Sequence, residues 1–99
     1  MHKIRVSARA ILLHEDNILL NRFGDSAYYN FPGGGIEKEE SAPETVIREV
    51  FEESGLIVGV ERHLFTYEYE PERCKNFSGH TPHISLFFKC ILLGAPKIG

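Results

Sequence analysis

The stretch FPGGGIEKEESAPETVIREVFEESGL, residues 31–56, decides the expected fold, because a glycine-rich turn leads directly into a strongly marked helix. Ser41 and Glu44 have the spacing of a capping box, with the serine as N-cap and the glutamate at N3. A proline in the first turn fits, since the N–H groups there have no helical partner, and Gly55 fits just past the end. The sequence therefore predicts a helix over residues 42–54.

The predicted helix carries an apolar arc beside an acidic one, at about 100° per residue. The apolar arc is predicted to face a core and consists of Val46, Ile47, Val50 and Phe51. The acidic arc consists of Glu49, Glu52 and Glu53. Like charges at these spacings repel, and the last turn is already the negative end of the macrodipole. Arg48, four residues from both Glu44 and Glu52, compensates only part of this charge.

A bound divalent cation would neutralise the remaining negative charge of the glutamates. Ligation by carboxylates points to Mg²⁺ or Mn²⁺ rather than zinc. The alternative is a solvated acidic face, which is the common meaning of a charge run on a helix. The run Gly33, Gly34 and Gly35 favours the cation, because glycines let backbone groups approach a metal or a phosphate closely.

These residues also match the fixed positions of a known motif. The matching positions, with their spacing intact, are Gly34, Glu40, Arg48, Glu49, Val50, Glu52, Glu53, Gly55 and Leu56. So many constrained positions in register are very unlikely to arise by chance. The pattern resembles the Nudix box, which covers about a quarter of the chain.

The resemblance implies an α/β (α+β) fold like the Nudix αβα sandwich, with a mixed β-sheet and the box helix packed on it. It also implies a hydrolase of nucleoside diphosphates linked to another group. The counterparts of Glu49, Glu52 and Glu53, with the carbonyl of Gly33, hold the catalytic divalent ions in such enzymes, and the counterpart of Arg48 orients the glutamates. Water would attack a bridging diphosphate, and Glu52 or Glu53 would take its proton.

Length and composition favour a single domain over residues 1–99 of ordinary globular type. A net charge of −3 and the lack of a basic block argue against nucleic acid as a partner. Cys74 and Cys90 lack metal-ligand spacing, and no signal peptide or membrane-spanning run is present. A cytoplasmic protein acting on a small nucleotide substrate is expected.

Alternating and β-branched runs predict strands on both sides of the helix. The predicted strands cover residues 3–13, 18–22, 56–60, 64–70 and 83–93. The first two form a hairpin, and residues 71–82 form a long polar loop that we expect to have a function.

Candidate substrate contacts are spread along the chain: Arg5, Arg9, Arg22, Tyr28, Tyr29, Gly34 and Gly35. The two tyrosines either stack on a base or simply pack. A further metal ligand from a late loop has stand-ins in His80 and His83, with Glu68, Glu70 and Glu72 beside them. Histidines in polar loops are commonly just solvated.

The chain stops directly after the last predicted strand, where relatives of this kind continue into a second helix. Either the chain is a fragment, or a second copy supplies the missing layer, or the chain is a minimal variant. We expect a C-terminally incomplete domain that forms a homodimer by sheet extension or by exchange of elements, because the last strand leaves an apolar sheet face uncovered.

Three functions remain open from the sequence. The first is a nucleoside triphosphate pyrophosphatase, and the second is a hydrolase of ADP-ribose or a nucleotide sugar. The third is a nucleotide-binding module without turnover, which the intact set of Glu49, Glu52 and Glu53 argues against.

Overall fold

The computed structural model describes residues 4–22, 29–69 and 82–95. The elements in chain order are β1 (Arg5–His14), β2 (Asn17–Ile18), β3 (Asn21–Arg22), β4 (Tyr29–Asn30), β5 (Gly33–Gly35), α1 (Ala42–Ser54), β6 (Ile57–Tyr69) and β7 (His83–Gly94). The helix begins and ends where the sequence predicts. Among the described residues, no helix has the length and apolar character needed to cross a bilayer.

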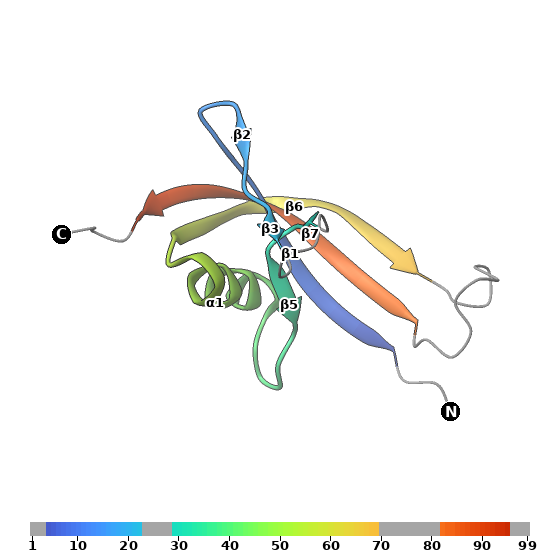
Figure 1. The fold of residues 1–99 in the computed structure, drawn as a ribbon. Coiled ribbons are helices and arrows are strands. Elements are labelled where there is room, and N and C mark those ends of the chain that lie inside the picture. Colours follow the sequence, from blue (N-terminus) through green and yellow to red (C-terminus); the bar gives the residue numbers. More distant parts are fainter. Residues whose placement is uncertain (1–3, 23–28, 70–81, 96–99) are drawn as a thin grey trace.

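The main sheet is mixed, which confirms the predicted fold class. Its strands run in the order β2-β1-β7-β6, and β5 pairs with the edge of β1 that β7 leaves open. β1 and β7 are parallel, whereas β6 pairs antiparallel with β7 and β5 antiparallel with β1. Figure 1 shows α1 along one side of this sheet, with β5 beside it. β3 and β4 form a separate two-stranded pair.

The core lies between α1 and one face of the sheet. Small side chains on β1 let the helix approach, since Ala8 and Ala10 are fully buried. The buried cluster consists of Ala8, Ala10, Leu12, Val46, Val50, Val58, Phe88 and Cys90. β1 and β7 are in register with the even-numbered residues facing the helix, so the odd-numbered residues point to the opposite face.

Both helix ends have the caps that the sequence predicts. The Glu44 N–H donates to Ser41 Oγ at 3.2 Å, and the Ser41 N–H donates to Glu44 Oε1 at 3.0 Å. Gly55 has a φ of 77°, and its N–H donates to the Phe51 carbonyl at 2.8 Å. These caps fix the ends of the helix that carries the acidic residues.

The predicted apolar arc of the helix is only half right. Val46 and Val50 are fully buried together with Thr45, but Ile47 and Phe51 are 40% and 55% exposed. The helix is rolled about its axis so that the Glu49 side, rather than the Ile47 side, turns toward β5. Of the acidic arc, Glu49 therefore lies next to the two valines at the inner face, while Glu52 and Glu53 stay exposed.

Three strand predictions need correction. The glycine run is a strand, β5, and not a turn. The two predicted strands 56–60 and 64–70 are replaced by one, because β6 runs without a break from Ile57 to Tyr69, with irregular pairing at Ile57/Val58, Val60/Arg62 and His63/Phe65. The predicted strand 18–22 is divided between β2 and β3, which belong to different sheets. The predicted strands at residues 3–13 and 83–93 are confirmed by β1 and β7, whereas most of the predicted loop 71–82 lies outside the described residues.

The face of the sheet opposite α1 has no helix over it in the described part of the chain (Figure 1). A row of aromatic rings lies there, with Phe87 stacked on Phe65 at 4.6 Å and edge-on to Phe31 at 5.7 Å between ring centroids. The expected homodimer stays a prediction.

Candidate active site

The carboxylates of α1 face the glycine strand β5. A Cβ atom on Gly34 would lie 2.7 Å from the Glu49 carboxyl carbon, so only glycine lets the strand come this close to the helix. The Glu49 side chain is 20% exposed as a result. The Gly33 N–H also donates to Glu53 Oε1 at 3.1 Å. Two turns of the helix therefore present an acid to the same short piece of backbone.

The opposite side of β5 is equally tight. Gly33 has a φ of 153°, and a Cβ atom there would lie 2.2 Å from the Ala8 carbonyl oxygen. A Cβ on Gly35 would meet nothing within 4 Å. Gly33 and Gly34 are thus required by packing between β1 and α1, whereas Gly35 is free of that constraint.

Arg48 donates hydrogen bonds to several of the acidic side chains around it. Its Nε and Nη2 donate to the two oxygens of Glu40 at 2.7 and 3.0 Å, a bidentate pair. Its Nη1 donates to Glu49 Oε1 at 3.0 Å and to Glu52 Oε2 at 3.3 Å. Glu37 lies farther out, with 3.7 Å between its Oε1 and Nη2. One guanidinium therefore bridges the loop before the helix to two of the three box glutamates.

The pKa of Glu40 reflects this arrangement. The hydrogen bonds from Arg48, and next the one from the Thr45 hydroxyl at 2.6 Å, lower the pKa of Glu40 from its usual 4.5 to about 2. The same contact with Glu40 raises the pKa of Arg48 above its ordinary value. Both groups are fully ionised at neutral pH.

Glu44 is not a partner of Arg48, although its spacing suggested one. Its carboxylate is occupied by the Ser41 N–H of the capping box. Arg48 turns instead to Glu40, eight residues earlier. The predicted contact with Glu52 is present.

Glu53 is held separately from the other two box glutamates. Asn21 Nδ2 donates to Glu53 Oε1 at 2.8 Å, and the Gly33 N–H donates to the same oxygen. Oε1 is thus bound by two donors from two different strands. The other oxygen, Oε2, makes no hydrogen bond to the residues that the structure describes.

All three box glutamates share this pattern. Within the described ranges, Glu49 Oε2, Glu52 Oε1 and Glu53 Oε2 make no hydrogen bond, while each partner oxygen is bound. Carboxylate oxygens of this kind fit a hard divalent cation chemically. No three His, Cys, Asp or Glu side chains among the described residues are grouped closely enough to hold a metal ion. A cation shared by all three glutamates therefore requires at least one side chain to move from the position seen here.

Comparison of the whole sequence with models of known protein families gives the same result as the box residues. The NUDIX domain model matches residues 3–99. The chain belongs to the Nudix family. No curated protein sequence matches it.

Solved Nudix structures share the fold. A NUDIX hydrolase from Nitrosomonas europaea has a TM-score of 0.80 at 24% identity, over 97% of this chain and 64% of that one. A UDP-X diphosphatase has a TM-score of 0.78 at 24% identity, over 100% of this chain and 47% of that one. An ADP-ribose pyrophosphatase from Streptococcus suis has a TM-score of 0.73 at 29% identity, over 96% of this chain and 65% of that one. The chain spans about half to two thirds of the length of these three proteins.

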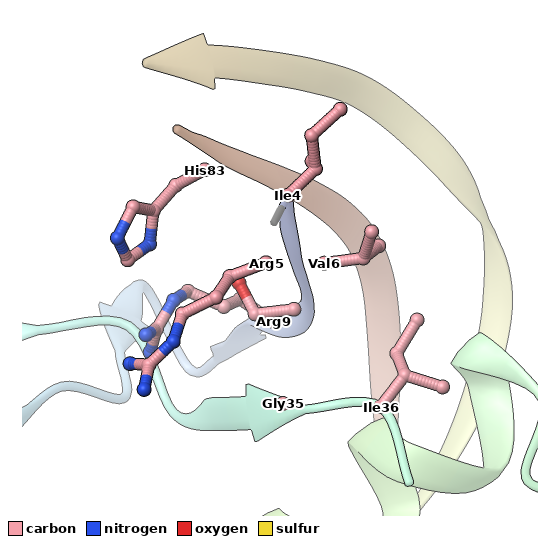
Figure 2. Close-up of a pocket in the computed structure, with 8 residues that line it drawn as sticks. Ile4, Arg5, Val6, Arg9, Gly35, Ile36 and His83 are labelled. Carbon is pink, nitrogen blue, oxygen red and sulfur yellow. The ribbon is translucent and has the colours of Figure 1, made fainter. Parts of the chain in front are cut away.

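The candidate substrate contacts fall into three places. Arg5, Arg9 and Gly35 line one pocket, together with His83 (Figure 2). Gly34 lies against Glu49. Arg22 and Tyr29 are paired across β3 and β4, away from that pocket's lining. Glu68, one of the candidates for a further metal ligand, is exposed on β6. The remaining candidates lie outside the described residues: Tyr28, Glu70, Glu72 and His80.

Sequence reasoning missed two contacts of the site. Glu40 was recognised as a fixed box position, but its spacing from Arg48 is not that of helical neighbours, so nothing predicted the bidentate pair. Asn21 gave no signal, because it lies on a two-residue strand far from the box and reaches Glu53 only through the fold.

Proposed function

We propose that the chain is a divalent-metal-dependent hydrolase that cleaves the diphosphate bridge of a nucleoside diphosphate linked to another group. Membership of the Nudix family supports this proposal. One observation carries the proposal. In each of the three box glutamates, one carboxylate oxygen accepts a hydrogen bond from the protein, and the other makes none to the described residues.

The residues have separable roles in this proposal. Glu49, Glu52 and Glu53, with the carbonyl of Gly33, would hold Mg²⁺ or Mn²⁺, which when bound neutralises charge on the phosphate oxygens. Arg48 keeps Glu49 and Glu52 oriented toward each other despite their repulsion. Asn21 and the Gly33 N–H fix Glu53 Oε1, so Oε2 is the oxygen that would accept a proton from the attacking water when it does not itself bind the cation. The water oxygen bonds to phosphorus as the bridging P–O bond breaks, giving two phosphorylated products.

Two substrate classes are candidates within this reaction. Nucleoside triphosphates would yield a nucleoside monophosphate and pyrophosphate. ADP-ribose or a nucleotide sugar would yield a nucleoside monophosphate and a sugar phosphate, and the 29% identity to a protein described as an ADP-ribose pyrophosphatase favours this second class. A binding module without turnover is disfavoured, since it has no need for three mutually repelling carboxylates.

A substrate panel tests the proposal. The chain is incubated with nucleoside triphosphates, ADP-ribose and UDP-sugars in Mg²⁺, in Mn²⁺ and in excess EDTA. Phosphate is then measured after inorganic pyrophosphatase for the first class and after alkaline phosphatase for the others. We expect metal-dependent release from at least one class. Equal release in excess EDTA would contradict the metal requirement, and release from none would contradict the activity.

A further inference from the structure

A pocket of about 390 Å³ lies where β5 separates from the edge of β1. β5 pairs with β1 only as far as Ser7, and beyond it the Ile36 N–H donates to the Val6 carbonyl at 3.1 Å. The strand edge beyond that point, toward Ile4, contributes to the pocket wall. The described residues that line it are Ile4, Arg5, Val6, Ser7, Arg9, Gly35, Ile36 and His83.

The parallel pairing of β1 and β7 brings the side chains of two arginines and a histidine together at this pocket. Arg5 is the register partner of His83, and Ser7 is the partner of Ser85 two residues along. The two serine hydroxyls lie 2.9 Å apart, so side chains on this face meet across the strands. Figure 2 shows the nitrogen atoms of Arg5, Arg9 and His83 on one side of β1, with Ile4, Val6 and Ile36 on the other.

Among the described residues of the pocket lining, none is acidic, so they do not neutralise the charge of the two arginines. Arg9 is anchored, since its Nη1 donates to the Phe31 carbonyl at 2.8 Å. The guanidinium of Arg5 makes no hydrogen bond or ion pair with the residues that the structure describes. A free guanidinium beside an anchored one suits bidentate binding of a carboxylate or a phosphate.

The pocket is within reach of the box glutamates through β5. Gly33 donates to Glu53 at one end of this strand, and Gly35 lines the pocket at the other. Two residues of extended strand span roughly 7 Å. A substrate whose diphosphate lies at the glutamates can therefore place another of its groups at the pocket.

We propose that this pocket binds a second anionic group of the substrate, a carboxylate or a phosphate located away from the cleaved bridge. The inference rests on the proposed hydrolase function and narrows its substrate class. The enzyme then prefers nucleoside diphosphate derivatives that carry such a group. Arg5 is the group that recognises it, with Arg9 adding positive charge and the His83 ring beside them.

Matched ligand pairs test the proposal by binding as well as by turnover. UDP-glucuronic acid differs from UDP-glucose by a carboxylate on the sugar, and ADP-ribose 2′-phosphate differs from ADP-ribose by a phosphate on the nucleoside half. Isothermal titration is performed in Mg²⁺ with Arg5→Gln and, as control, Arg62→Gln, an exposed arginine on β6 of the same sheet. Hydrolysis of each ligand is measured in parallel.

We expect the charged member of at least one pair to bind about tenfold more tightly, as a charge-assisted bidentate contact allows. Arg5→Gln should abolish the preference, while Arg62→Gln should keep it and leave the affinity for the uncharged member unchanged. The pair that responds identifies the half of the substrate in the pocket. No preference in either pair, or a preference that survives Arg5→Gln, overturns the proposal.

Failure of the proposed function is distinguishable from failure of this inference. A binding preference lost in Arg5→Gln, without any hydrolysis, would support the pocket and contradict the enzyme. Hydrolysis of both members of each pair at equal rates and affinities would support the enzyme and contradict the pocket. His83→Gln provides a second variant and should weaken the preference, and thermal unfolding of each variant checks that the fold is retained.

Discussion

The two ends of β5 meet opposite electrostatic surroundings. At Gly33 and Gly34 the backbone touches the carboxylates of Glu53 and Glu49. At Gly35, one end of the same strand, the neighbouring side chains are basic or neutral and include Arg5. The acidic end is tightly organised, with each carboxylate already bound to protein donors. The basic end is open, and its principal cation has no partner among the described residues.

This difference shows that one short strand separates two kinds of binding. A pre-formed network of donors holds the acids in place before any ligand arrives, which is how a catalytic group is kept oriented. An unpaired cation beside an open pocket instead gains its partner from the ligand. The acidic end should therefore control the rate of reaction and the basic end the choice of substrate. The predictions below test that division.

The largest expected effect is that of Glu53→Gln. The substitution keeps the hydrogen-bond geometry at Oε1 but removes the proton acceptor, so kcat should fall by about 10²- to 10⁴-fold. Glu52→Gln should also lower turnover, through loss of a metal ligand. Circular dichroism and thermal unfolding should stay unchanged, because both side chains are exposed. The control is Glu61→Gln, whose carboxylate pairs with Lys89 on β7 at 3.1 Å. A fully active Glu53→Gln would remove Glu53 from the mechanism.

Arg48→Lys should have the next largest effect. A lysine has a single ammonium and cannot reproduce the bidentate pair with Glu40 while reaching Glu49 and Glu52. We expect Mn²⁺ affinity to fall by about 10- to 100-fold, the usual cost of losing a group that orients metal ligands. The ranking of substrates should not change, since that is assigned to the pocket. Isothermal titration with Mn²⁺ measures the effect, and Arg62→Lys is the control. Unchanged affinity would contradict the role of Arg48.

Asn21 is a positioning residue for Glu53 in this scheme, and its removal should have a smaller effect. Asn21→Ala leaves Glu53 Oε1 with the Gly33 N–H alone, so kcat should fall by about tenfold, comparable to one hydrogen bond to a charged group, at unchanged KM. Asn21→Asp should be worse, because it adds like charge at 2.8 Å. Asn17→Ala, whose amide donates only to the Glu15 carbonyl in an exposed turn, is the control. Equal activities of the alanine and aspartate variants would indicate that Asn21 does not act through Glu53.

The two ends of β5 also differ in how much of them the sequence could predict. The helix at the acidic end follows from local rules, since the capping residues Ser41 and Gly55 lie where the sequence placed them. The contacts that the sequence did not predict involve residues outside the helix. Arg48 pairs with Glu40 rather than Glu44, and Asn21 of the β3–β4 pair donates to Glu53. The basic end arises from pairing between strands 78 residues apart in the chain. Arg5 and Arg9 were chosen only as cations, and nothing local indicated that His83 would join them.

A further prediction concerns stability at low pH. Because Arg48 and the Thr45 hydroxyl lower the pKa of Glu40 from 4.5 to about 2, the folded state binds this proton more weakly than the unfolded state. The stabilisation is complete above pH 4.5 and is lost as the pH falls toward 2. Glu40→Gln should therefore be less stable at pH 7 and should show a shallower loss of stability over this interval. Urea unfolding at a series of pH values measures it, with Glu61→Gln as an exposed control expected to behave like the native chain. A Glu40→Gln variant with the native pH dependence would contradict the assignment.

The smallest effect expected is weak self-association through the face of the sheet opposite α1. Side chains on that face remain open in the described part of the chain: Phe65, stacked on Phe87, is 48% exposed, and Leu93 farther along β7 is 63% exposed. Apolar groups gathered in this way favour contact with a second copy, so light scattering should show a dimer at micromolar concentration that dissociates on dilution. Leu93→Asp should shift the equilibrium to monomer without unfolding the chain. Ile47→Asp on α1, at the other side of the sheet and 40% exposed, should leave it unchanged.

Because Arg5 and His83 point to the same face as Phe87, a dimer formed there would also limit access to the basic pocket. Dilution should then strengthen binding of the anionic ligands while leaving the metal affinity of the acidic end unaltered. A single monomeric species at all concentrations would instead show that this face needs no second copy.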